Sequence, residues 1–169
     1  MKITAEMIRE KRACLAGQEW FESAFPEGCE YQATIDRAVE DDHPDYAGWL
    51  LGCFGATNDV LEVDGDLERK YLYFAGSIKV SGRIAIEFSI EAGRGIEAGR
   101  GIEAGDGIEA GWGIEAGWGI EAGDGIKAGD DFGIYAGLKV EISRKEISAL
   151  VIAKTKPNNL MCGVYKTPS

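Results

Sequence analysis

A six-residue phrase, Ile-Glu-Ala-Gly-x-Gly, recurs seven times from residue 90 onward, the last copy carrying Lys127 in place of glutamate and Asp131 in place of the second glycine. A short fixed period indicates a stack of near-identical structural units. We therefore expect any function to lie on a regular surface rather than in a deep pocket. The isoleucines that begin the copies are Ile90, Ile96, Ile102, Ile108, Ile114, Ile120 and Ile126.

The composition of the phrase selects one class of fold. Two glycines in six residues exclude an α-helix, because each costs about 1 kcal/mol in a helix interior. The recurring glutamate excludes a membrane span. Ile and Ala lie two residues apart and so share one face of a short strand, with Glu on the other face. We expect the glycines to turn corners, since glycine reaches positive φ cheaply. Short strands with a corner every six residues predict a parallel β-solenoid.

The repeat phase extends upstream to Leu72, Ile78 and Ile84, which gives ten units. Three units per coil would place Arg94 near Trp112, a plausible cation–π pair. This arrangement is favoured, although two units per coil and either handedness stay open. Three units per coil would also place Arg100 near Trp118. Glu97 would then stack on Glu115, and Glu103 on Glu121. Glu91, Glu109 and Lys127 would form a third column.

The first 57 residues have a different pattern, with apolar residues at helical spacing. We expect helices over residues 4–16, 18–25 and 31–40, and a fourth that begins near Pro44. The predicted fold class is α+β, a small N-terminal helical bundle followed by a parallel β-solenoid of six-residue repeats. We assign 1–57 to an acidic helical head, 58–153 to the solenoid, and 154–169 to a C-terminal cap strand and tail.

The rhythm breaks at Asp131-Phe132, a two-residue insertion. Residues 134–142 then alternate as a strand, residues 147–152 form a further apolar run, and residues 161–165 read as a last short strand. This end should cap the solenoid, because an open sheet edge invites pairing with other chains.

The net charge of −11 is unevenly distributed along the chain. Residues 1–70 hold 16 acidic and 7 basic side chains, whereas residues 131–169 hold 3 and 6. An acidic surface repels nucleic acids and membranes and attracts basic partners. The partner that we expect is therefore a basic protein surface, not a nucleic acid or a membrane.

Catalytic and metal-binding motifs are not evident in the sequence. The four cysteines are far apart and read as free, buried thiols of a cytoplasmic protein. His43 is the single histidine and precedes Pro44, where it fits a turn. We predict no catalytic residues, no metal site, no cofactor and no enzymatic activity. A hexapeptide-type acyltransferase ranks last, because such an enzyme needs a catalytic histidine in a solenoid loop.

The candidate partner-binding residues fall into three groups, each with a purely structural alternative. The head cluster could be a solvated turn, and the repeat glutamates could serve solubility alone. The two tryptophans could be an interface pair, where Trp is often a hot spot, or could pack against the covering chain. Self-association through them also stays open. These residues are Glu40, Asp41, Asp42 and Asp45 in the head, and Glu97, Glu103, Glu115, Glu121, Trp112 and Trp118 in the repeat.

Two stretches carry a resemblance to known proteins. The pattern Met7…Cys14…Gln18-Glu19-Trp20-Phe21…Phe25-Pro26-Glu27-Gly28, followed by Ile-Glu-Ala-Gly repeats, resembles phage and prophage proteins that include anti-CRISPR inhibitors of type I-C complexes. The resemblance implies a phage-encoded DNA mimic that blocks target binding by a CRISPR surveillance complex in the bacterial cytoplasm. The alternative is a structural or spacer phage protein built on a solenoid. The binding face is expected on the head rather than the repeat, because residues 1–70 hold the larger net charge. The oligomeric state stays open.

Overall fold

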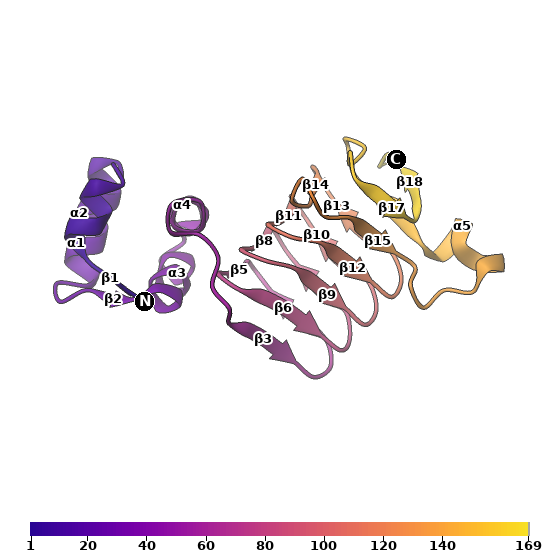
Figure 1. Cartoon of the computed structure of the whole chain (residues 1–169), viewed down its shortest axis with the longest axis horizontal. Helices are drawn as coiled ribbons and strands as arrows, with labels where there is room; N and C mark the ends of the chain where they lie inside the picture. Colours follow the sequence, from indigo (N-terminus) through magenta and orange to yellow (C-terminus); the bar gives the residue numbers. More distant parts are fainter. Residues whose placement is uncertain (169) are drawn as a thin grey trace. The chain divides into compact units, whose positions relative to one another are not determined.

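The chain forms two compact units. The computed structural model describes residues 1–168, and only the backbone of Ile142. The first unit, the head, comprises Met1–Gly55, and the second, the solenoid, begins at Ala56. Figure 1 shows helices in the first unit and stacked strands in the second, which confirms the predicted α+β fold with a parallel β-solenoid.

The head contains four helices and one small antiparallel strand pair. Its buried side chains include Phe21, Ile35 and Leu50. The hydroxyl of Tyr31 donates hydrogen bonds to the carbonyls of Leu50 and Gly55 at 3.1 and 3.0 Å, so it ties two of the helices together. The elements are β1 (Lys2–Ile3), α1 (Ala5–Glu10), α2 (Leu15–Ala24), β2 (Cys29–Glu30), α3 (Tyr31–Glu40) and α4 (Pro44–Phe54).

The helix predicted over residues 4–16 is in fact two elements. Thr4 caps α1 as expected, accepting a hydrogen bond from the Met7 amide. The helix ends early because Arg12 has a φ of 61°, in the left-handed region. Cys14 then caps α2, since its Sγ accepts from the Gly17 amide at 3.4 Å. The helix predicted at 31–40 matches α3, and Pro44 begins α4 as expected.

Three parallel sheets form the sides of the solenoid. Successive strands along the chain belong to different sheets, so each of the first four coils contributes one strand to each side. Sheet 1 contains β3 (Val60–Val63), β6 (Ser77–Val80), β9 (Ile96–Ala98), β12 (Ile114–Ala116), β15 (Ile134–Ala136) and β17 (Leu160–Cys162). Sheet 2 contains β4 (Leu67–Arg69), β7 (Ile84–Ile86), β10 (Ile102–Ala104), β13 (Ile120–Ala122), β16 (Leu150–Ile152) and β18 (Val164–Lys166).

Sheet 3 has two strands fewer than each of the other sheets. It contains β5 (Leu72–Phe74), β8 (Ile90–Ala92), β11 (Ile108–Ala110) and β14 (Ile126–Lys127). Within the repeat, each residue pairs with the residue eighteen positions later, as Ile96 does with Ile114. The predicted arrangement of three units per coil is therefore confirmed, and the alternative of two is wrong.

The solenoid core is a set of stacked Ile and Ala columns. Ile102 and Ile120 are aligned on adjacent strands, as are Ala104 and Ala122, and all four are buried. Burying one Ile side chain contributes about 1.5–3 kcal/mol. The repeat thus stabilises itself by adding the same apolar pair at every strand.

The glycines serve a different purpose from the one predicted. None of the repeat glycines has positive φ; the positive values occur at other glycines, such as Gly65 and Gly137. Instead, the first glycine of each unit lies against the backbone of the preceding coil. A Cβ on Gly123 would overlap the carbonyl oxygen of Gly105, whereas a Cβ on Gly125 would meet no atom within 4 Å. The first position of each corner is therefore a glycine because the backbone of the neighbouring coil leaves no room for a side chain, not because the residue has a positive φ.

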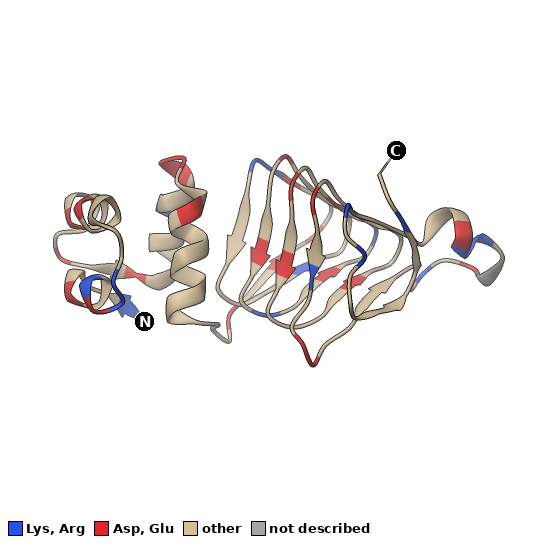
Figure 2. Ribbon diagram, turned by 90° about the horizontal axis from the view of Figure 1, so that it is seen from above, with Lys and Arg blue, Asp and Glu red and all other residues tan. Residues whose placement is uncertain are grey.

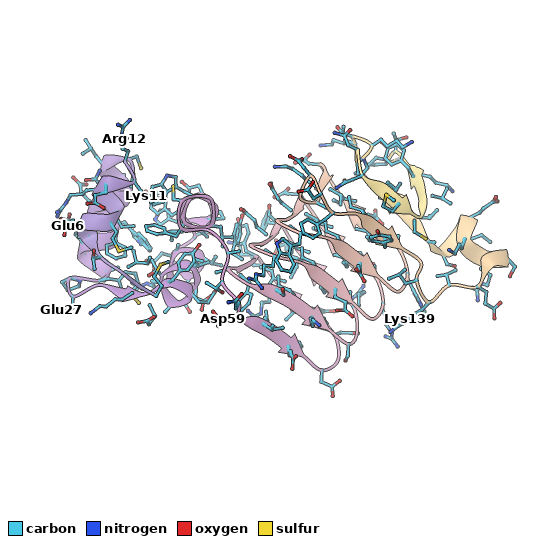
Figure 3. The ribbon with its side chains drawn as sticks, in the orientation of Figure 1. Glu6, Lys11, Arg12, Glu27, Asp59 and Lys139 are labelled. Atoms are coloured by element: carbon cyan, nitrogen blue, oxygen red, sulfur yellow. The ribbon has the colours of Figure 1, made fainter. Side chains whose placement is uncertain are left out.

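The C-terminal region continues the coils instead of forming one alternating strand. The strand predicted over 134–142 ends at Ala136, because Gly137 turns with a φ of 78°. A 3-10 turn, η1 (Ile142–Arg144), and the short helix α5 (Lys145–Ser148) precede β16. The single strand predicted over 161–165 is two strands, β17 and β18, separated at Gly163. Figure 3 shows Lys139 projecting outward from this excursion.

We predict that Gly123→Ala and Gly125→Ala, two changes in one six-residue unit, differ sharply in stability. Overpacking at position 123 should lower the free energy of unfolding by about 1–3 kcal/mol. The change at 125 should stay within about 0.5 kcal/mol. Urea denaturation followed by circular dichroism measures both. Equal losses in the two variants would contradict the conclusion that only the first glycine of each unit lies too close to the preceding coil for a side chain.

Candidate binding surface

The glutamates in the second position of each unit point outward and stack in rows. Glu97 is aligned with Glu115 on sheet 1, and Glu103 with Glu121 on sheet 2. On sheet 3, Glu91 is aligned with Glu109, which is followed by Lys127. The predicted stacking is confirmed, and acidic residues recur on successive coils (Figure 2).

These rows do not form one patch. The pair Glu97 and Glu115 lies on sheet 1, whereas Glu103 and Glu121 lie on sheet 2. The sequence could not separate them before the number of units per coil was known. A charge change at all four residues would therefore alter two different faces at once.

Basic side chains neutralise part of each row. Arg83 bridges Glu68 at 3.0 Å and Glu103 at 3.4 Å. Lys79 lies 3.6 Å from Glu97. Within the described residues, Glu115 and Glu121 form no ion pair. Exposed pairs of this kind contribute about 0–1 kcal/mol, but each one reduces the local negative charge that a partner meets.

Sheet 2 carries a group of carboxylates of which only Glu103 and Glu121 were among the candidate binding residues. Glu68, Glu87, Glu103 and Glu121 line one shallow groove of about 730 Å³. At the adjoining corner, the Asp124 amide donates to the Asp106 carbonyl at 2.8 Å, so these two residues occupy successive coils. We call the six residues Glu68, Glu87, Glu103, Asp106, Glu121 and Asp124 the sheet-2 face. The eighteen-residue spacing predicts that Asp106 stacks near Asp124 when three units form a coil, and this prediction is confirmed.

Trp112 belongs to a stacked ladder at the corner between sheets 3 and 1. The Arg94 guanidinium lies 4.5 Å from its ring centroid, which confirms the predicted cation–π pair. Phe132 stacks with the same ring at 5.5 Å and an interplanar angle of 11°. Arg94 also donates to the side chain of Asn58. The two-residue insertion at 131–132 thus supplies the third layer of the ladder.

Trp118 lies at a different corner, so the two tryptophans do not form a pair. Its amide donates to the Arg100 carbonyl at 3.2 Å, which places the two residues on adjacent coils as expected. The Arg100 guanidinium, however, lies 3.9 Å from Asp66. The side chain of Trp118 is 53% exposed, compared with 42% for Trp112. Trp112 therefore has a packing role, whereas Trp118 is a surface residue.

The four acidic residues of the head cluster also differ in their surroundings: three are exposed, and one makes hydrogen bonds within the head. Glu40, Asp42 and Asp45 are exposed. Asp41 accepts hydrogen bonds from Arg37 Nε and from Trp20 Nε1, both at 2.8 Å. The bond from Arg37 and then the bond from Trp20 lower the pKa of the Asp41 carboxyl. Asp41 therefore joins α2 to α3, and replacing it would perturb the head rather than report on binding.

His43 and the four cysteines are the residues that the sequence offered for catalysis or metal binding. The His43 ring stacks on Tyr46, with centroids 4.6 Å apart, and lies beside Trp20. All four cysteines are free, but the prediction that they are buried is wrong, because Cys14 is exposed and the others are partly exposed. Lys11 and Arg12, at the end of α1, are among the head side chains labelled in Figure 3.

Sheet 3 holds the most perturbed groups of the solenoid. Burial, followed by the charge of Glu91, raises the pKa of Tyr73 to about 12. Burial also raises the pKa of Glu91, and the neighbouring Glu109 adds to the effect. Lys127 donates to Glu109 at 2.5 Å. Glu91 is thus a partly buried carboxylate next to a like charge.

Comparison with known proteins gives one match, confined to the head. Residues 1–54 match the family described as the YdhT N-terminal domain. No curated protein and no solved structure matches the chain. The match ends where the helical head ends, before the first strand of the solenoid. Separately, no helix among residues 1–168 has the length and apolar character needed to cross a membrane.

We predict that Glu91→Gln stabilises the free protein at neutral pH. A carboxyl with a raised pKa in the folded state stabilises the fold below its unfolded pKa, and this contribution is lost as pH rises through the folded pKa. The parent should therefore lose stability relative to the variant as pH rises from the ordinary range of a glutamate pKa through the raised pKa of Glu91. Urea midpoints at several pH values measure the difference. Glu115→Gln, at an exposed equivalent position, should change the midpoints little; an equal gain there would contradict the assignment.

Proposed function

We propose that the protein is a non-enzymatic inhibitor that occupies a cationic DNA-binding surface of a protein partner. The partner implied by the sequence resemblance is a type I CRISPR surveillance complex in the cytoplasm of a bacterial host, and the origin is a phage. The acidic solenoid then acts as a DNA mimic. It presents carboxylates where the partner would otherwise bind phosphates.

One observation carries this proposal: the sheet-2 face arranges carboxylates in rows on a regular scaffold. Glu103 and Glu121 lie on adjacent paired strands, which are about 4.8 Å apart. DNA carries one negative charge per roughly 1.7 Å of its axis, and proteins bind it with Lys and Arg. Two neighbouring rows, on the sheet and at its corner, bring the carboxylate density of this face towards that of DNA, although Arg83 pairs with Glu103 and Lys154 with Asp124.

The arrangement also supplies a reason for a cationic partner to bind. Like charges on adjacent strands destabilise a sheet, and Glu121 has no ion pair within the described residues. A partner's Lys or Arg would relieve this repulsion. Because the backbone already holds the rows in place, the ordering cost of association falls on the side chains alone.

The structure narrows the difference in charge on which the head was favoured as the binding site, since residues 1–55 carry a net charge of −6 and residues 56–169 one of −5. The acidic run from Asp59 to Glu68 belongs to the first coil, which includes β3 and β4, and not to the head. Asp41 is committed to internal contacts. We therefore assign the mimicry to the sheet-2 face.

A structural spacer is the second candidate function. The family match ends at the head, which fits a module attached to a solenoid of adjustable length. A spacer has no need of carboxylates at particular positions. Charge reversal therefore separates the two candidates.

We predict that Glu87→Lys with Glu121→Lys weakens competition with DNA for a purified type I-C surveillance complex by about tenfold or more. Glu40→Lys with Asp45→Lys changes the net charge by the same amount in the head and should leave competition intact. The assay measures displacement of labelled target DNA by each folded variant.

Competition by both variants at the parent's level would contradict the mimicry and favour the spacer. Loss in the head variant alone would contradict the placement on sheet 2. Circular dichroism of each variant confirms that the fold is retained.

A further inference from the structure

The early end of sheet 3 leaves a groove along the third side of the solenoid. After β16 in the fifth coil, the chain runs along the third side as an irregular segment, residues 154–159, instead of a strand. Pro157 in this segment is buried. The segment and the outward residues of sheet 3 enclose a groove of about 720 Å³. This volume falls in the range of ligand-binding clefts.

The groove is long enough for several residues of a peptide. Its lining runs from Tyr73 in β5 through Glu91 and Glu109 to Lys127 in β14, and so spans four coils. At about 4.8 Å per coil this corresponds to roughly 14 Å, or about four residues of extended chain. A single small ligand would leave most of that length empty.

The charges in the groove favour a cation at one position. Lys127 is paired with Glu109 at 2.5 Å. Glu91 forms no ion pair within the described part of the chain, and it is less exposed than the equivalent glutamates of later units. The other charged groups that line the groove are Asp130 and Lys156, whose charges oppose each other. Glu91 is therefore a partly buried carboxylate of the groove that lacks an ion pair within the described residues, and the charge of Lys127 offsets it only in part.

We propose that this groove binds an extended basic segment of a protein partner, with one Lys or Arg side chain paired to Glu91. This inference rests on the proposed function and names a second contact with the same cationic partner. The methylene stem of the basic side chain would lie beside the Tyr73 ring, and its charged end would reach the carboxylate. In the free protein Glu91 is poorly solvated beside Glu109, so the partner's cation relieves a cost already present.

Nuclear magnetic resonance of protein with labelled glutamate carboxyls tests the proposal with a defined probe, acetyl-Gly-Lys-Gly-Lys-Gly-amide. Binding of the peptide should lower the pKa of Glu91, because a bound cation favours the carboxylate. Affinity should therefore increase as pH rises through that pKa. Glu91→Gln should weaken binding by about tenfold or more, and Glu115→Gln should leave it unchanged.

Two control probes decide between occupants. The same peptide with norleucine in place of lysine should not bind measurably. Spermidine at equal concentration should bind more weakly, because it lacks the peptide backbone that fills the groove; equal affinity would indicate a polyamine site instead. An unchanged pKa of Glu91 at saturating peptide, or equal losses in the two glutamine variants, would overturn the proposal.

The outcome is separable from that of the DNA-competition assay. Peptide binding at Glu91 by a protein that fails to compete with DNA would support the groove and contradict the mimicry. Competition with DNA without peptide binding would do the reverse.

Discussion

The close contact between successive coils at the glycine corners determines the rest of the solenoid. At Gly123 the backbone lies directly against the carbonyl of Gly105, eighteen residues earlier, with no room for a side chain. This contact fixes the register, and the register aligns Ile with Ile and Glu with Glu in every sheet. The apolar columns hold the coils together, while the acidic rows follow as a consequence of the same alignment.

Periodicity made the solenoid predictable but not its irregular parts. Equal spacing of Ile and Glu indicated the strands, and the Arg94–Trp112 pair indicated three units per coil. The sequence could not show that Arg83 bridges Glu68 and Glu103, because these residues lie fifteen and twenty positions away. The C-terminal coils were also hidden, since the turn at Gly137 and the helix α5 interrupt the phase. In the head, the spacing of apolar residues predicted one helix over residues 4–16, but the left-handed backbone of Arg12 ends the first helix and a second one begins after it.

The few residues that depart from the repeat make the three sides of the solenoid different in charge and shape. Lys79 moderates the row on sheet 1, and the ladder of Arg94, Trp112 and Phe132 closes one of its corners. On sheet 2, Arg83 and Lys154 pair with half of the face's carboxylates, and Glu87, Asp106 and Glu121 are left without an ion pair among the described residues. Sheet 3 ends early and forms a groove with Glu91 at its centre. Near-identical units thus produce three different surfaces, and charge alone would not distinguish them in the sequence.

The eighteen-residue register is the central claim, because the core, the acidic rows and the groove all depend on it. Electron paramagnetic resonance tests it with nitroxide labels in a chain whose native cysteines are replaced by serine. Labels at Glu97→Cys and Glu115→Cys should show strong spin–spin broadening, since adjacent strands lie about 4.8 Å apart. Labels at Glu97→Cys and Glu109→Cys, twelve residues apart, should show little. Strong broadening for the second pair and not the first would contradict three units per coil and the surfaces derived from it.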